Sequence, residues 1–403
     1  MSDGFRVNSR SRSVFLAIVF CALVSIPVLF FFFSQLVEAY RFSMWEDELY
    51  GLQYSMRAHS YWDLVIRGAQ GQGSPSPLDY LVNKFIDQIK ESINYLGLPP
   101  HVYFRIFSNF ITSLTAFMIP VYFWINLRKT SNQNVLILAA QFLILVCVPF
   151  AFLYEFQIYK YAHEIRPYAL WVSIYFVSLA LLLKWRTDLN YFLLISLIAL
   201  SLSATTSFFQ IGAMLTAFIC ANYLDKVPIT KIAKPALKLF LIPIAISFYY
   251  CLRVGEWNYS GEQWGTWVDF YAYWEHFLVL TIPLIAIVVV CFLKQSLHLI
   301  AIGPLSFLVI YFSGPLIFWL TRSKGFFYAD RQYIYYEVAR PLLLLVVVEC
   351  LSRLSTVRAK KWLALLLIAA TIGSMLIAIR PKYLKRFQKS VVQTTQLFHG
   401  LIF

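Results

Sequence analysis

The sequence predicts an all-α fold, a polytopic membrane bundle of about eleven transmembrane helices that forms a single domain over residues 1–403. Its composition gives the first reason, because 60% of the 403 residues are hydrophobic and only 13% are charged, far from the balance of a soluble domain. The second reason is that charge-free apolar runs recur along the whole chain. Each is about as long as a helix must be to cross a bilayer. No stretch is left for a sizeable soluble domain.

These apolar runs define the expected helices. The first follows Arg6, Arg10 and Arg12, is too long for the core of a signal peptide, and is expected to remain as a membrane span. Residues 189–224 also carry no charge, but they are too long for one helix, and the polar run 203–207 predicts a hairpin turn at their middle. The expected spans are 14–37, 106–127, 135–154, 167–183, 190–204, 207–224, 239–252, 277–293, 299–320, 340–352 and 362–379.

Basic residues in the short connections predict the orientation. Nearly half of the 34 Lys and Arg residues, but only three acidic residues, fall in the N-terminus and in the connections 128–134, 184–189, 225–238, 294–298 and 353–361. Because basic connections stay in the cytoplasm, the opposite face is expected to be extracytoplasmic. That face holds the first loop, residues 38–105, and the C-terminal tail, residues 380–403.

Two segments of the outer face are predicted to be amphipathic surface helices. Between Leu78 and Leu96, apolar residues recur at helical spacing along one face, with charged residues elsewhere. This pattern predicts a juxtamembrane helix that lies on the membrane. In the tail, basic residues from Lys382 to Lys389 interleave with apolar ones. The tail is predicted to anchor on anionic headgroups, with contact to an anionic lipid substrate as the alternative.

Three adjacent carboxylates, Glu46, Asp47 and Glu48, follow the first span. Carboxylates beside hydrocarbon are costly unless they are hydrated, paired or placed in a polar cavity. The run is therefore either a solvated loop or part of a functional site. The predicted topology brings two further charged motifs, at 163–170 and 329–333, to the same face. This convergence favours a site.

Three motifs of the chain resemble those of the polytopic C-type (GT-C) glycosyltransferases that use polyprenyl-phosphate sugars, especially the branch with protein O-mannosyltransferases and the lipid A aminoarabinose transferase. Asp47-Glu48 is similar to the acidic pair of that family's first outer loop. Residues 164–170 (Glu-Ile-Arg-Pro-Tyr-Ala-Leu) resemble its Glu-Ala-Arg-Pro-Tyr-Ala-Leu signature, which is the most specific match. Pro77-Leu78 with Tyr80 resembles the end of its His-Pro-Pro-Leu-Tyr-Tyr segment.

The chain departs from the family's pattern in two places. Pro75 stands at the histidine position of the His-Pro-Pro-Leu segment and Ser76 follows it. The family's late Arg-Tyr followed by Pro is matched loosely, by Arg331, Tyr333 and Pro341. The motifs cover about residues 44–185, and the remainder matches mainly in topology.

The resemblance implies transfer of a sugar from a polyprenyl-phosphate donor to an acceptor hydroxyl. Because the phosphate leaves as a weak base, the reaction needs no strong general acid, but it needs a carboxylate to deprotonate the acceptor and cations to hold the phosphate. We expect Asp47 to be the catalytic base and Glu48 to position the acceptor or a metal. The residues expected to bind the donor phosphate are Arg166, Arg331 and Arg105, of which Arg105 could instead be a snorkelling residue at the membrane boundary. The residues expected to position the substrate are Glu164, Tyr168 and Tyr333.

Several alternatives stay open. Asp47 and Glu48 could hold a divalent cation through oxygen ligands or act without one, and no other cofactor is expected. Direct displacement by a hydroxyl predicts inversion at the sugar. The rival functions are a transporter or flippase of a lipid-linked sugar and an O-antigen-type polymerase or ligase. The expected partners are the polyprenyl-phosphate donor, a lipid, glycan or protein acceptor, and the membrane, without nucleic acid. The expected location is the bacterial inner membrane, with the active site on the periplasmic side.

Overall fold

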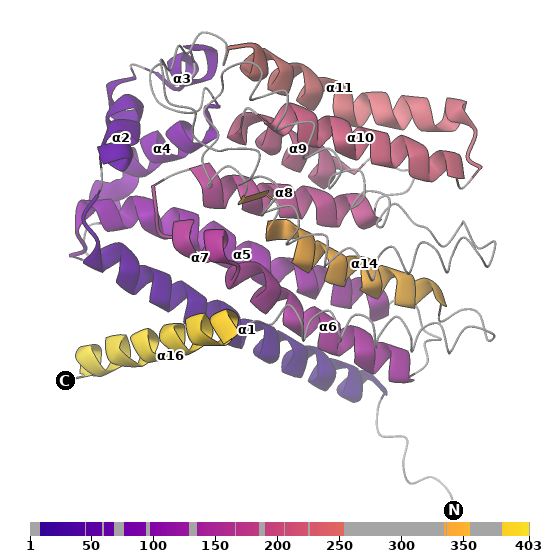
Figure 1. Ribbon diagram of the computed structural model, residues 1–403, viewed down its shortest axis with the longest axis horizontal. Helices are drawn as coiled ribbons and strands as arrows, with labels where there is room; N and C mark the ends of the chain where they lie inside the picture. Colours follow the sequence, from indigo (N-terminus) through magenta and orange to yellow (C-terminus); the bar gives the residue numbers. More distant parts are fainter. Residues whose placement is uncertain are drawn as a thin grey trace, which may run out of the picture.

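The computed structural model shows an all-α protein over the part of the chain that it describes (Figure 1). The described residues are 9–44, 46–58, 60–67, 76–93, 97–128, 135–165, 167–184, 190–204, 206–224, 226–253, 334–335, 337–354 and 381–402. Most of the helices lie side by side across Figure 1, and a group of further helices gathers at one end of the bundle.

Five of the described helices are long and apolar enough to cross a membrane. They are α1 (Ser9–Arg41), α5 (Pro100–Arg128), α6 (Val135–Leu153), α8 (Pro167–Lys184) and α11 (Ile229–Arg253). The several long apolar helices indicate a multi-pass membrane protein.

Three further helices also coincide with expected spans, namely α9 (Tyr191–Ser203), α10 (Ser207–Leu224) and α14 (Ala339–Leu354). The expected spans 277–293, 299–320 and 362–379 lie outside the described residues, so the number eleven remains a prediction.

The hairpin turn between α9 and α10 lies where the polar residues predicted it. α9 ends at Ser203 and α10 begins at Ser207, so the long charge-free stretch is two helices. The Ser207 hydroxyl donates a hydrogen bond of 2.6 Å to the carbonyl oxygen of Leu200 and so accounts for one acceptor of the last α9 turn. The predicted hairpin is confirmed.

The bundle is built from neighbouring pairs. α1 packs against α5 and α6, α5 against α8, α8 against α9, and both α9 and α10 against α11. α14 lies between α6 and α8, where the Gln141 side chain donates to the Val348 carbonyl oxygen over 3.1 Å. At the opposite end of α8 from Pro167, Lys184 pairs with the buried Glu349 of α14.

Three helices cap the end of the bundle where α1 finishes: α2 (Glu46–Arg57), α3 (Tyr61–Arg67) and α4 (Leu78–Ile93). The structure confirms the helix expected from Leu78 onward. The observed helix, α4, ends at Ile93. Its buried Ile86 packs in a small cluster with Leu52 of α2 and Phe104 of α5. Part of its apolar face therefore contacts protein, and its predicted contact with the membrane surface is not tested by the structure.

The tail forms α16 (Pro381–Ile402), which docks on α1 (Figure 1). Lys389 lies 2.8 Å from the carboxylate of Glu38. Arg386 donates to the carbonyl oxygen of Tyr154 over 2.7 Å and lies over a neighbouring aromatic ring. Two basic residues of the tail thus contact protein, and anchoring of the tail on anionic headgroups stays a prediction.

We expect Tyr250→Phe to loosen the cap formed by α2, α3 and α4. The Tyr250 hydroxyl donates to the Val65 carbonyl oxygen over 2.6 Å and so links α11 to α3. Losing such a bond costs about 1 kcal/mol, so limited proteolysis within residues 58–76 should become faster. Tyr249→Phe is the matched control, because Tyr249 donates to Ile66 in the same way but is 45% exposed and can bond to water instead. Equal cleavage of both variants would contradict this link.

Candidate functional site

The acidic run begins a helix rather than a solvated loop. Glu46 is the first residue of α2, so Asp47 and Glu48 lie in its first turn, where the helix dipole favours negative charge. Glu48 is fully buried and its Oε2 lies 2.6 Å from Nη2 of Arg105 on α5. The backbone of Asp47 is part of α2, while its side chain lies outside the described part of the structure.

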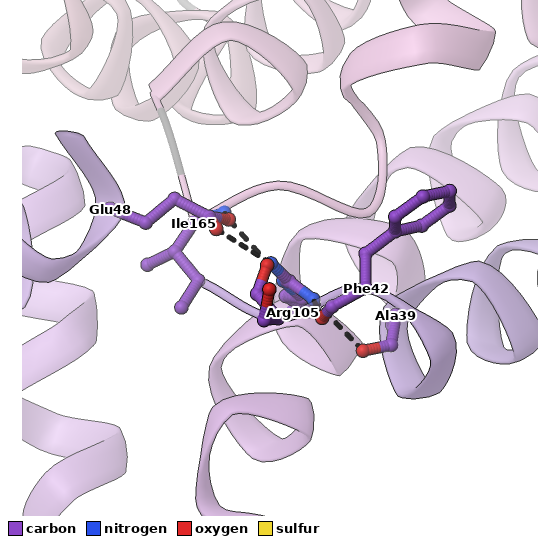
Figure 2. A network of polar contacts seen from close by, with 6 residues as sticks. Ala39, Phe42, Glu48, Arg105 and Ile165 are labelled. Carbon is purple, nitrogen blue, oxygen red and sulfur yellow. Dashed lines mark hydrogen bonds and ion pairs between the residues drawn. The ribbon is translucent and has the colours of Figure 1, made fainter. Parts of the chain in front are cut away.

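Arg105 holds the end of α1 and the start of α2 against α5 (Figure 2). Its Nε and Nη2 donate to the two carboxylate oxygens of Glu48, over 3.3 and 2.6 Å. Its other three N–H groups donate to the backbone carbonyls of Ala39 (2.9 Å), Phe42 (2.5 Å) and Ser43 (3.2 Å). A guanidinium has five N–H donors, so each one has a protein acceptor in this geometry.

The hydrogen bonds of Arg105 limit its expected role as a ligand of the donor phosphate. The side chain is only 2% exposed, and a phosphate could bind it only if existing hydrogen bonds were given up. Arg105 is therefore a structural cation in the geometry described, and its direct role in binding the donor stays a prediction.

The acidic run and the motif at 164–170 meet directly. The backbone N–H of Ile165 donates to Oε1 of Glu48 over 2.7 Å, although the two residues are 117 positions apart (Figure 2). The buried Ile165 side chain packs in the same apolar cluster as Leu52 and Phe104. The two motifs with the most specific resemblance thus share one buried carboxylate.

His163 lies on the α1 side of this contact. Its Nδ1 is 2.7 Å from Oε1 of Gln35, and its ring stacks on Phe42 with 6.1 Å between centroids. Burial lowers the pKa of His163 to about 4, and the nearby carboxylate of Glu38 opposes this shift. The imidazole is therefore neutral at pH 7.

The structure describes the other expected site residues only in part. Glu164 lies in the turn between His163 and Ile165, next to the contact with Glu48. Tyr168 is in the first turn of α8, with its ring 5.4 Å from that of Tyr161. The remaining three, which lie outside the described residues, are Arg166, Arg331 and Tyr333.

A second buried ionic cluster was not predicted from the sequence. Glu155 pairs with Arg340 over 2.6 Å at the start of α14. Glu337 accepts from the backbone N–H groups of Gln157 and Ile158, over 2.8 and 3.2 Å, at the start of α7 (Phe156–Tyr161). Burial, together with the neighbouring Glu155 carboxylate, raises the pKa of Glu337 well above its ordinary value. The sequence did indicate that Arg340-Pro341 opens a helix, but it did not indicate the partners.

Among the described residues, no three His, Cys, Asp or Glu side chains come together as a metal site would require. A cation bound by Asp47 and Glu48 stays an open expectation, because the Asp47 side chain is outside that set. Comparisons with protein-family models, with curated proteins and with solved structures gave no match.

We expect Arg105→Met to lower the free energy of unfolding by about 3–5 kcal/mol, because it leaves the Glu48 carboxylate buried without its counter-ion. The double variant Arg105→Met, Glu48→Leu should recover part of this loss. Denaturant unfolding in detergent measures both. The control is Lys90→Met, because Lys90 and Asp87 form a surface pair with side chains 31% and 27% exposed, worth less than about 1 kcal/mol. A loss no larger than that of the control would contradict the structural role.

The free energy of unfolding should decrease as the pH falls from about 6.5 to about 4. In this window the unfolded chain protonates His163 near its ordinary pKa of 6.5, while the folded chain holds that pKa at about 4, so the unfolded state binds more protons. The contribution is fully present above pH 6.5, and at most about 1.4 kcal/mol is lost per pH unit below it. Unfolding curves between pH 4 and 7 should be less pH-dependent for His163→Gln than for the wild type; parallel profiles would contradict the assignment.

Proposed function

We propose that this chain is a membrane glycosyltransferase that moves a sugar from a polyprenyl-phosphate donor to an acceptor hydroxyl at the extracytoplasmic, periplasmic face, in cell-envelope or protein glycosylation. One observation carries the proposal, namely the 2.7 Å hydrogen bond from the Ile165 N–H to Glu48. It links the acidic pair of α2 to the motif of residues 164–170. Both motifs resemble those of polyprenyl-phosphate-dependent transferases, and the bond gives them a common location in this fold.

In the proposed reaction the acceptor hydroxyl attacks the anomeric carbon of the sugar. The new C–O bond forms as the bond from that carbon to the donor phosphate oxygen breaks, and the phosphate leaves with the electron pair. Asp47 accepts the hydroxyl proton. Arg166 and Arg331 hold the phosphate, because a guanidinium binds phosphate oxygens in a bidentate manner and keeps its charge. Displacement in one step inverts the anomeric configuration.

The neighbours of Glu48 define its part in the proposal. Its carboxylate bonds to Arg105 and to the backbone of Ile165, so it positions the first turn of α2 against the loop before α8. The same contacts hold the backbone of the turn that carries Asp47, the proposed base. Glu164, Tyr168 and Tyr333 are proposed to position the substrate around this pair.

The distribution of charge favours a transferase over a transporter of a lipid-linked sugar. Ion-coupled transporters place ionisable residues near the middle of the membrane. Here α6, α9 and α10 contain no Asp, Glu, Lys or Arg, and α8 contains only Lys184, at its last position. The buried pair Glu48–Arg105 instead lies at the start of α2 and near the start of α5.

Asp47→Asn should lower the rate of sugar transfer by about 100-fold or more, because general base catalysis typically contributes that much. The assay follows labelled sugar from polyprenyl phosphate to acceptor with purified full-length protein. Asp87→Asn is the matched control, since Asp87 lies on the same cap but pairs with Lys90 at the surface, and its turnover should be unchanged. Unchanged turnover in Asp47→Asn removes Asp47 as the base, and translocation of the intact carrier without bond cleavage supports the transporter instead.

A further inference from the structure

A set of buried polar atoms lies between the outer parts of α8 and α10. The indole Nε1 of Trp171 donates to Oε1 of Gln210 over 3.1 Å, so these two side chains face each other. An indole nitrogen can only donate, which fixes the orientation of the Gln210 amide with its oxygen toward Trp171. Its Nε2 is therefore a true donor, and it has no partner among the described residues although Gln210 is 2% exposed.

Two hydroxyls extend this set. Tyr175 is four positions after Trp171 on the same face of α8, and Thr206 is four positions before Gln210, immediately before α10. The two hydroxyls therefore lie about one helical turn to either side of the Trp171–Gln210 bond. The Tyr175 side chain is fully buried, and its hydroxyl has no hydrogen-bond partner within the described structure. The buried Oγ1 of Thr206 also has none there.

Aromatic rings border the same region. The ring of Tyr335, just before α14, lies 5.6 Å from that of Trp171 and 6.5 Å from that of Tyr175. Flat rings pack on the apolar faces of sugars, while amides and hydroxyls bond to their edges. The three elements α8, α10 and the segment before α14 thus combine an aromatic platform with polar atoms that have no partner in the part of the chain that the structure describes.

The chemistry of the set specifies the kind of ligand. Gln210 offers amide donors, and the hydroxyls of Tyr175 and Thr206 can each donate and accept. The set contains no acidic or basic side chain, so it suits a neutral ligand with several hydroxyls rather than an ion. Where the described residues offer these buried groups no partner, leaving them unpaired costs free energy that a bound ligand would recover.

We infer that this cluster, which we call the Trp171–Gln210 subsite, binds the sugar ring of the donor. The inference rests on the proposed function, because it takes the donor to be a lipid-linked sugar. The position agrees with this role. Trp171 is one helical turn beyond Pro167, which follows the motif residues Glu164 and Arg166, and Tyr335 comes two residues after Tyr333. The subsite thus begins one turn of α8 after the segment whose Ile165 N–H bonds to Glu48.

The test compares binding of two probes to purified full-length protein. One probe is polyprenyl phosphate without sugar, and the other is polyprenyl phosphate bearing mannose, glucose, galactose or N-acetylglucosamine in turn. The wild type should bind at least one sugar-bearing probe more tightly than the bare carrier. The double variant Tyr175→Phe, Thr206→Val, which removes two hydroxyls with little change of shape, should lose about tenfold of that preference and keep its affinity for the bare carrier.

Stability separates a binding role from a structural one. The double variant should melt no lower than the wild type, because the removed hydroxyls have no protein partner in the described structure. Tyr154→Phe is the matched control: Tyr154 is equally buried, but its hydroxyl donates to the Pro27 carbonyl oxygen over 3.1 Å. This variant should melt at a lower temperature and keep the preference for sugar.

The outcomes are distinct. No preference for any sugar in the wild type, or the same preference in the double variant, overturns the subsite and leaves the cluster as a place for ordered water only. Because binding is measured without turnover, a lost preference together with an absence of sugar transfer supports the subsite and removes the proposed transferase activity. If the wild type transfers sugar but the double variant keeps the same preference for the sugar-bearing probe, the transferase activity is supported and the subsite is removed.

Discussion

The buried ion pair between Glu48 and Arg105 determines how the end of the bundle where α1 finishes is assembled. Two charges at 0% and 2% exposure are costly to bury, and their attraction compensates only when the remaining hydrogen-bonding groups are also satisfied. Here three backbone carbonyls take the spare donors of Arg105, and the Ile165 N–H bonds to Glu48. One pair therefore fixes the end of α1, the start of α2, α5 and the loop before α8.

Ion pairs recur at the ends of the described helices. Glu155 and Arg340 join the end of α6 to the start of α14, and Lys184 and Glu349 join α8 to α14 at the opposite end. Between these ion pairs, the apolar segments of α8 and α14 pack without charged side chains. In a bilayer, van der Waals packing between helices is weakly directional, so pairs at the helix ends can set which helices are neighbours. This division concentrates the buried charge of the described helices at their ends.

The sequence was a good guide where one local pattern decides the outcome, as at the α9–α10 turn and the helix that starts at Leu78. The sequence did not indicate which distant side chains contact one another. From the sequence, Arg105 was interpreted as a membrane-boundary residue or a phosphate ligand. Its actual neighbour, Glu48, is 57 positions away, and no local pattern indicates that the two lie side by side. The tail shows the same limit: its amphipathic pattern predicts two faces, but not that Lys389 contacts Glu38 on α1. Which surface covers an amphipathic face is decided by tertiary packing.

The length of α9 indicates how deep in the membrane the polar cluster around Thr206 lies. At 1.5 Å per residue its 13 residues rise only about 20 Å, less than the roughly 30 Å of a hydrocarbon core. If its inner end lies at one boundary, the turn that carries Thr206 falls short of the other, within the thickness that the longer α1 and α5 cross. Unpaired polar groups at such a depth need partners, because lipid supplies none. A recessed turn agrees with the proposed function, in which the sugar of the donor enters below the surface while the lipid chain of its carrier stays in the bilayer.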